Sequence, residues 1–144
     1  MNNNYSFQKF TSFNSRSAEQ TVTITKNNTI GISSAFAEEH NLDKYNFAVL
    51  YYDRVASSIG IKFVNDRSEA AKFSLTRAQV GKGASIIAHS FFKKNNIQVE
   101  KYAGSKYFPK KLNARKDLNL NEPGSIFVID LREPFVKDAS GEKK

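Results

Sequence analysis

Residues 26–42 read KNNTIGISSAFAEEHNL, and residues 81–97 read GKGASIIAHSFFKKNNI. Each stretch begins with a Gly- or Asn-containing turn and continues into a short apolar run. Each then passes through Ser or His into an amphipathic segment that ends with Asn-Leu or Asn-Ile. This pattern predicts a strand that leads directly into a short helix. The same local pattern therefore occurs twice in the chain, and the second copy begins 55 positions after the first.

At this offset the apolar positions agree, whereas one exposed pair changes its charge. The matched pairs are Ile32 with Ile87, Phe36 with Phe91, Asn41 with Asn96, and Leu42 with Ile97. The exposed pair Glu38-Glu39 is replaced by Lys93-Lys94. Apolar positions that keep their spacing, together with an exposed pair whose charge is reversed, favour a diverged internal duplication. The alternative is that two hairpin-and-helix units converged on the same pattern.

The remaining β-branched and alternating runs predict short antiparallel strands joined by short loops. The expected strands are 21–26, 29–33, 47–52, 58–64, 72–76, 84–88 and 125–131, with extended segments at 99–102 and 106–112. Pro109 restricts the last of these to a sheet edge or a bulge. We therefore expect an α+β fold, a β-rich antiparallel barrel or sandwich with two short helices. With the duplication, this fold becomes an internal pseudo-dimer.

Two short helices are expected after the strands that end near residues 33 and 88. In the first, Ser33 or Ser34 is the N-cap, Glu38 and Glu39 occupy the first turns, and Asn41 ends the helix. The second helix is expected at 91–97, with His89 or Ser90 as its cap.

We divide the chain into an aromatic N-terminal arm (1–20), a single compact β-rich domain (21–132) and a charged flexible tail (133–144). The domain contains the two repeats, 21–76 and 81–131. The arm carries Tyr5, Phe7, Phe10 and Phe13, which is unusual for a purely disordered segment. We interpret it as an edge element of the domain or as a docking arm for a partner or a second copy of the chain.

Composition excludes several classes of protein. The 144 residues include no cysteine, which excludes a disulfide scaffold, a thiolate zinc site and a cysteine nucleophile. No apolar run approaches the roughly 18 residues that a membrane-spanning helix needs. The first residues, MNNNYSFQKF, lack the apolar core of a signal peptide. We therefore expect a soluble cytoplasmic protein without a membrane partner.

The net charge of +8 is confined to one part of the chain. Residues 82–116 contain nine basic residues and one acidic residue, Glu100, whereas thirteen basic and thirteen acidic residues balance outside this window. Such a local concentration of positive charge gives information about the binding partners of a protein rather than about its fold. The alternatives are a nucleic acid, an acidic protein partner, or simple solubility.

The order of turn, strand and capped helix in TKNNTIGISSAF (25–36), followed by the hairpin FAVLYYDRVASSIGIKFV (47–64), resembles the swapped-hairpin AbrB-type family of DNA-binding proteins. The resemblance covers roughly 21–64 and, more weakly, 81–131. It implies two interlocked copies and phosphate contacts from basic residues near the strand and helix. In the second copy those residues would be Lys82, Lys93 and Lys94.

No catalytic signature is present. His40 and His89 are the only histidines, and no second His or Cys lies at the spacing of a metal site. Gly81-Lys82-Gly83 is shorter than a phosphate-binding P-loop. We therefore expect no enzyme, no metal and no cofactor.

The hypothesis is a non-enzymatic nucleic-acid-binding protein, for which a regulatory role would fit. Lysine dominates the basic window, which suits contact with the phosphate backbone more than base-edge reading. Neighbouring aromatic side chains can stack on unpaired bases. The predicted binding residues are Lys82, Lys93, Lys94, Lys106, Lys110, Lys111, Arg115 and Lys116, with Tyr102, Tyr107 and Phe108 for stacking. DNA is expected rather than RNA, and the chain is expected to form a homo-oligomer. The alternative is an assembly subunit that docks through the aromatic arm.

Overall fold

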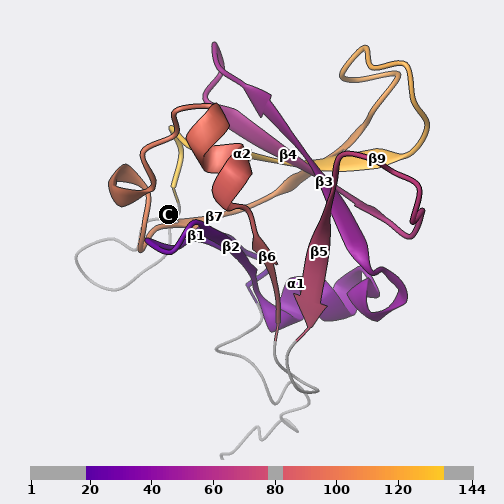
Figure 1. Ribbon diagram of the computed structural model, residues 1–144, viewed down its shortest axis with the longest axis horizontal. Coiled ribbons are helices and arrows are strands. Elements are labelled where there is room, and N and C mark those ends of the chain that lie inside the picture. Colours follow the sequence, from indigo (N-terminus) through magenta and orange to yellow (C-terminus); the bar gives the residue numbers. More distant parts are fainter. Residues whose placement is uncertain (1–18, 78–82, 135–144) are drawn as a thin grey trace, which may run out of the picture.

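The computed structural model of the chain describes residues 19–77 and 83–134 (Figure 1). Its strands are β1 (Val22–Ile24), β2 (Thr29–Ile32), β3 (Phe47–Asp53), β4 (Ser58–Val64), β5 (Lys72–Arg77), β6 (Ala84–Ile87), β7 (Lys106–Tyr107), β8 (Lys110–Asn113) and β9 (Ser125–Asp130). The helices are α1 (Ser34–Glu39) and α2 (His89–Lys94), with 3₁₀ turns η2 (Leu42–Lys44) and η3 (Val99–Lys101). The predicted aromatic side chains of the arm, Lys82, and most of the predicted tail lie outside the described residues.

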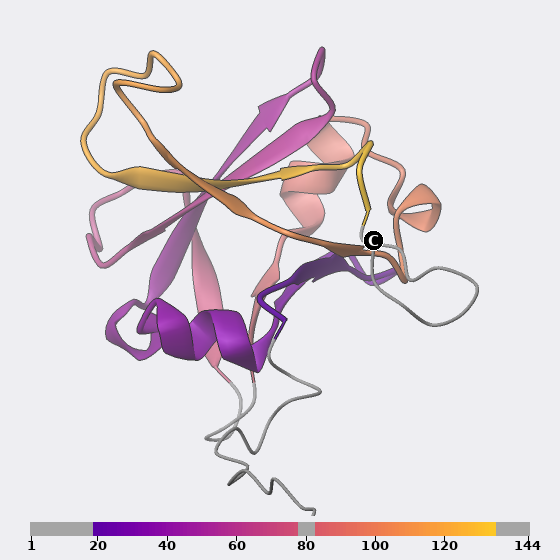
Figure 2. The same cartoon turned by 180° about the vertical axis from the view of Figure 1, so that it is seen from behind.

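The nine strands form one antiparallel sheet in the order β7-β1-β2-β6-β5-β3-β4-β9-β8. Strands β7 and β8 lie at opposite ends of this order, yet only Phe108 and Pro109 separate them in the chain. Two residues span at most about 10 Å between their flanking Cα atoms. The sheet therefore curls into a half-barrel until its two edges approach each other, as Figures 1 and 2 show. The strand-rich fold expected from the sequence is confirmed.

The predicted repeats 21–76 and 81–131 share one run of elements, a strand followed by a six-residue helix and a 3₁₀ turn: β2, α1 and η2 in the first, and β6, α2 and η3 in the second. The helices begin 55 positions apart, at Ser34 and His89. Strands β2 and β6 pair with each other in antiparallel register, so that Ile30 lies opposite Ile86. In addition, β1 pairs with β7 of the second repeat, whereas β5 pairs with β3 within the first repeat.

Local sequence signals account for the turn and the cap at the first helix. Asn28 adopts a positive φ of 62° in the β1–β2 turn, and Asn41 adopts 54° after α1, a conformation that Asn tolerates well. Ser33 is the N-cap of α1, and its Oγ accepts a hydrogen bond from the Phe36 amide at 3.2 Å. These three predictions are confirmed.

Other local predictions are wrong. Glu38 and Glu39 lie in the last turn of α1 rather than the first, because the helix has only six residues. Helix α2 begins at His89, with Ala88 as an N-cap that makes no side-chain hydrogen bond. The segment expected to be extended near residue 100 forms the 3₁₀ turn η3 instead. Packing of Val99 into the core accompanies this tighter turn.

The core lies inside the curl of the sheet, and both helices contribute aromatic side chains to it. Phe36 of α1 packs against Phe127, with ring centroids 4.8 Å apart, while Phe91 and Phe92 of α2 are buried on another side. Figures 1 and 2 place α1 and α2 at opposite ends of the curled sheet. Among the described residues, no helix has the length and apolar character needed to cross a membrane.

Candidate nucleic-acid interface

All seven described members of the predicted basic set have exposed side chains. They are Lys93, Lys94, Lys106, Lys110, Lys111, Arg115 and Lys116. Of these seven, only Lys106 forms an ion pair with a described residue: its Nζ lies 3.6 Å from Oε1 of Glu19. The other six cations are therefore not neutralised by contact with a described carboxylate. An exposed and uncompensated set of this kind gives the surface a positive potential that attracts polyanions.

Five of these cations follow one continuous path along the molecule. Strand β7 pairs with β1 at one edge of the sheet, and β8 pairs with β9 at the other. The segment that joins them crosses the molecule from the β1 edge toward the loop 114–124, as both views show. It brings Lys106, Lys110 and Lys111 onto one extended stretch, and Arg115 and Lys116 follow directly in the turn after β8.

Lys93 and Lys94 do not lie on this path. They occupy the last turn of α2, and Figures 1 and 2 show α2 well separated from the loop 114–124. The basic window is thus divided between a strand path (residues 106–116) and a helix end. We restrict the candidate interface to the strand path.

The three predicted stacking residues differ in exposure. Tyr107 is only 2% exposed and belongs to the hydrophobic core, so its ring is not accessible to a base and that prediction is wrong. Burial is also the main cause that raises the pKa of its phenol. Tyr102 is partly buried against the core. Phe108 is 48% exposed, which leaves a large part of its side chain accessible to a ligand.

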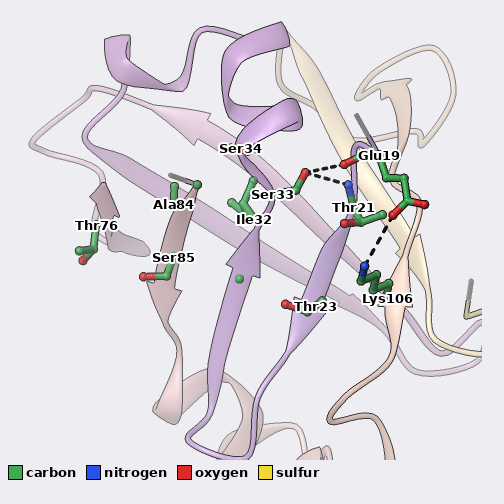
Figure 3. A pocket seen from close by; sticks show the side chains of 12 residues that line it. Glu19, Thr21, Thr23, Ile32, Ser33, Ser34, Thr76, Ala84, Ser85 and Lys106 are labelled. Carbon is green, nitrogen blue, oxygen red and sulfur yellow. Dashed lines mark hydrogen bonds and ion pairs between the residues drawn. The ribbon is translucent and has the colours of Figure 1, made fainter. Parts of the chain in front are cut away.

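Next to Lys106, the outer face of the sheet carries a shallow groove of about 500 Å³, which we call the hydroxyl groove because six of its twelve lining residues are Ser or Thr (Figure 3). Five aligned residues cross it, one from each of five adjacent strands. They are Lys106, Thr23, Gly31, Ser85 and Thr76. At the ordinary spacing between strands, this row spans roughly 19 Å. Such a length suits an extended ligand better than a compact one.

Gly31 has no side chain, so no side chain projects from the centre of this row into the groove. A Cβ atom at Gly31 would lie 2.7 Å from Oγ1 of Thr23, so a side chain here would displace its neighbour. The groove is closed at one end by Ser33, whose Oγ accepts from the Thr21 amide at 3.0 Å and donates to the Glu19 carbonyl at 2.9 Å. These bonds attach the start of β1 to the first turn of α1.

A second cavity, of about 270 Å³, lies beside His40 at the end of α1. The His40 ring packs between Phe36 and Phe127, with centroids 4.4 Å and 4.7 Å away. Burial lowers the pKa of His40, and the positive charge of Lys111 lowers it further, whereas Glu39 acts in the opposite direction. Lys111 also lines this cavity.

The loop 114–124 is attached to the sheet by a polar network. Oε1 of Glu122 accepts hydrogen bonds from the Tyr51 hydroxyl at 2.7 Å and from Nζ of Lys62 at 2.8 Å. Lys62 also donates to the Pro123 carbonyl at 2.8 Å. These donors lower the pKa of Glu122, and burial with the same carboxylate raises the pKa of Tyr51. The network positions the loop that carries Arg115 and Lys116.

The second histidine has a structural contact. The side-chain amide of Asn28 donates to Nδ1 of His89 at 3.0 Å, which links the β1–β2 turn to the start of α2. In residues 19–77 and 83–134, no group of three or more His, Cys, Asp or Glu side chains is arranged to hold a metal ion.

Comparison with known proteins identifies no relative: no family model, no curated protein and no solved structure matches the chain. The interface therefore rests on its geometry.

Sequence reasoning missed two features of this geometry. One is the hydroxyl row of Thr23, Ser85 and Thr76, and the other is the proximity of His40 to Lys111. The alternation of β1 (TVTIT) does place Thr23 on the polar side of its strand. However, nothing local indicates that Ser85 and Thr76 continue the same row.

Proposed function

We propose that the protein is a non-enzymatic nucleic-acid-binding protein that contacts the phosphate backbone through the strand path 106–116, with DNA as the expected ligand. The observation that carries the proposal is the run of exposed cations at Lys110, Lys111, Arg115 and Lys116, none of which is paired with a described carboxylate. Lys110 and Lys111 are adjacent in β8 and point to opposite faces of the strand, so they would contact phosphates on different sides of this segment. Each phosphate contact releases counterions.

The hydroxyl groove supports this proposal because it begins at Lys106, where the strand path also begins. Ser and Thr hydroxyls are common donors to phosphate and sugar oxygens. A backbone that follows the strand path would meet the row of Thr23, Ser85 and Thr76 beside Lys106. The groove contains one carboxylate, Glu19, which is in contact with Lys106. Binding would therefore proceed with the lysine side chain changing partner from this carboxylate to a phosphate.

Phe108 supports contact with unpaired bases. It lies between Lys106 and Lys110 in the chain, and all three side chains are exposed while Tyr107 is buried. An aromatic ring between two cations is a frequent arrangement in proteins that bind single strands, since the ring stacks on a base and the cations hold the backbone. We therefore expect single-stranded DNA to bind more tightly than a duplex of equal length.

The test is a binding titration of labelled single-stranded and duplex DNA, and of RNA of both kinds, at several salt concentrations. We expect binding to weaken linearly on a log–log plot against salt, with a slope of about 0.7 per contacted phosphate for single strands. Absence of binding to all four ligands at low salt would refute the proposal.

We also propose that the chain is an internal pseudo-dimer of two swapped-hairpin units of the AbrB type. The support is the register: the pair Ile30–Ile86 becomes the pair Ser85–Gly31 when each residue is moved by 55 positions to its counterpart, and both pairs are present. Strand β1 of the first repeat also pairs with β7 of the second repeat. In such a pseudo-dimer the two repeats pair within one chain, so the predicted homo-oligomer would form through a different surface.

A further inference from the structure

We propose that the cavity beside His40 is a binding site for a phosphate monoester, with Lys111 and His40 as the groups that hold the phosphate. This site lies apart from the hydroxyl groove, because the two cavities share no lining residue. It shares Lys111 with the strand path 106–116, but it does not require nucleic acid to bind there.

The cavity joins cationic and aromatic side chains from separate parts of the chain. Lys111 comes from β8, Lys62 and Phe63 from β4, and Tyr45 from the residue after η2, while Ser125 begins β9. Its volume of about 270 Å³ is at the lower end of the range for small-molecule sites. It has room for a phosphate group and part of the ring or sugar attached to it.

Of the two lysines, Lys111 is the available cation. Nζ of Lys62 is already bonded to the Glu122 carboxylate and to the Pro123 carbonyl, both at 2.8 Å. Lys111 has no ion pair among the described residues, and its side chain is exposed. Its charge acts on His40 more strongly than the opposite charge of Glu39 on α1. An anion bound between Lys111 and His40 would offset this positive charge.

His40 is held in place and has unused hydrogen-bonding capacity. Its ring packs between Phe36 and Phe127, and its nitrogens make no hydrogen bond to any described residue. A neutral imidazole can donate one N–H to a phosphate oxygen, and an imidazolium can donate two. An anion that binds here would stabilise the charged ring and so raise the pKa of His40.

A phosphate monoester fits this donor set better than a carboxylate. It presents three acceptor oxygens, which match the Lys111 ammonium, a His40 N–H and the Ser125 hydroxyl. Tyr45 and Phe63 form an aromatic wall that can contact an attached base or sugar. The same chemistry is offered by inorganic phosphate, a mononucleotide or the phosphorylated end of an oligonucleotide, and the experiment separates these sources.

The test follows the ring signals of His40 by NMR across a pH series, since the chain has only two histidines. The additions are inorganic phosphate, adenosine monophosphate, adenosine, and a short oligonucleotide with and without a 5′-phosphate. We expect both phosphate compounds to shift the His40 signals and raise its pKa, with the mononucleotide binding at least tenfold more tightly than inorganic phosphate. Adenosine alone should leave the signals unchanged.

The variant Lys111→Gln should weaken phosphate binding at least tenfold, and Lys26→Gln, which removes the same charge from an exposed position outside both the cavity and the strand path, should not. If the phosphorylated oligonucleotide alone shifts His40, the source is a strand end rather than a free nucleotide. The proposal is overturned if no phosphate compound shifts His40 at millimolar concentration, or if Lys111→Gln responds like the wild type. Because wild-type binding to unphosphorylated DNA is measured separately, failure here leaves the proposed function intact.

Discussion

Tyr107 and Phe108 are adjacent in the chain, yet Tyr107 is 2% exposed and Phe108 is 48% exposed. Tyr107 lies opposite Val22 in the pairing of β7 with β1 and points into the core. Phe108 follows on the outer side, immediately before Pro109, where the chain leaves one edge of the sheet for the other. One of two consecutive aromatic residues therefore serves stability, and the other is accessible to a ligand.

Phe108→Ala should reduce binding to single-stranded DNA by about 1–3 kcal/mol, or about 5- to 150-fold, because a stacked base would lose its aromatic partner. Binding to duplex DNA should change little, since paired bases do not stack on the ring. The measurement is a titration of both ligands at one salt concentration. Val55→Ala is the control, because Val55 is a 93% exposed apolar residue at the tip of the β3–β4 hairpin. Equal loss for both DNA forms would argue against stacking.

A triple charge reversal on the strand path, Lys110, Arg115 and Lys116 to Glu, should abolish measurable DNA binding at physiological salt. It removes three phosphate contacts, so any residual binding should show a salt slope reduced by about 2–3. The matched control reverses Lys26, Lys44 and Arg67, which are exposed and lie outside the path. Both variants lower the formal net charge from +8 to +2. If the control loses as much affinity, net charge rather than the strand path determines binding.

Tyr107→Ala should destabilise the protein by about 3–5 kcal/mol, because it removes a large buried ring and leaves a cavity. Tyr107→Phe keeps the buried ring and removes only its hydroxyl, so it should cost no more than about 1 kcal/mol. Urea unfolding followed by circular dichroism measures both. Phe108→Ala in the same assay should fall within about 1 kcal/mol of the wild type. A small effect of Tyr107→Ala would contradict its place in the core.

The free energy of unfolding should decrease as the pH falls through 6.5, the ordinary pKa of histidine. His40 has a lowered pKa in the folded protein, first because of burial and second because of Lys111. The unfolded chain therefore takes up a proton at a higher pH than the folded chain, and stability that is complete above pH 6.5 is progressively lost below it.

Urea unfolding in phosphate-free buffer between pH 7.5 and 5.5 measures this slope. His40→Gln should flatten it by removing the titrating group. Lys111→Gln should reduce it in part, since burial remains while the repulsive charge is gone. An unchanged slope in His40→Gln would show that another group is responsible.

Several elements could be predicted because their signals are local. Asn28 and Asn41 adopt positive φ where the sequence predicts a turn and a helix end. Ile59 and Ile61 of β4 are buried, as their place in an apolar run predicts, although Ser58 and Gly60 beside them are buried as well. Pro109 interrupts the extended segment that contains it. The helix registers were less predictable, because six-residue helices depend on packing more than on intrinsic propensity.

The sequence by itself determined most of the strands, the first turn and the concentration of positive charge in residues 82–116, since each of these depends on neighbouring residues. The tertiary structure decided which charges act together. Lys106, Lys110 and Lys111 lie on one path because β7 and β8 pair with opposite edges of a curled sheet, while Lys93 and Lys94 lie elsewhere. The row of Thr23, Gly31, Ser85 and Thr76, and the approach of Lys111 to His40, arise from pairings between residues far apart in the chain. Local periodicity gives the face of a strand, but the register between distant strands is set by the packing of the whole core.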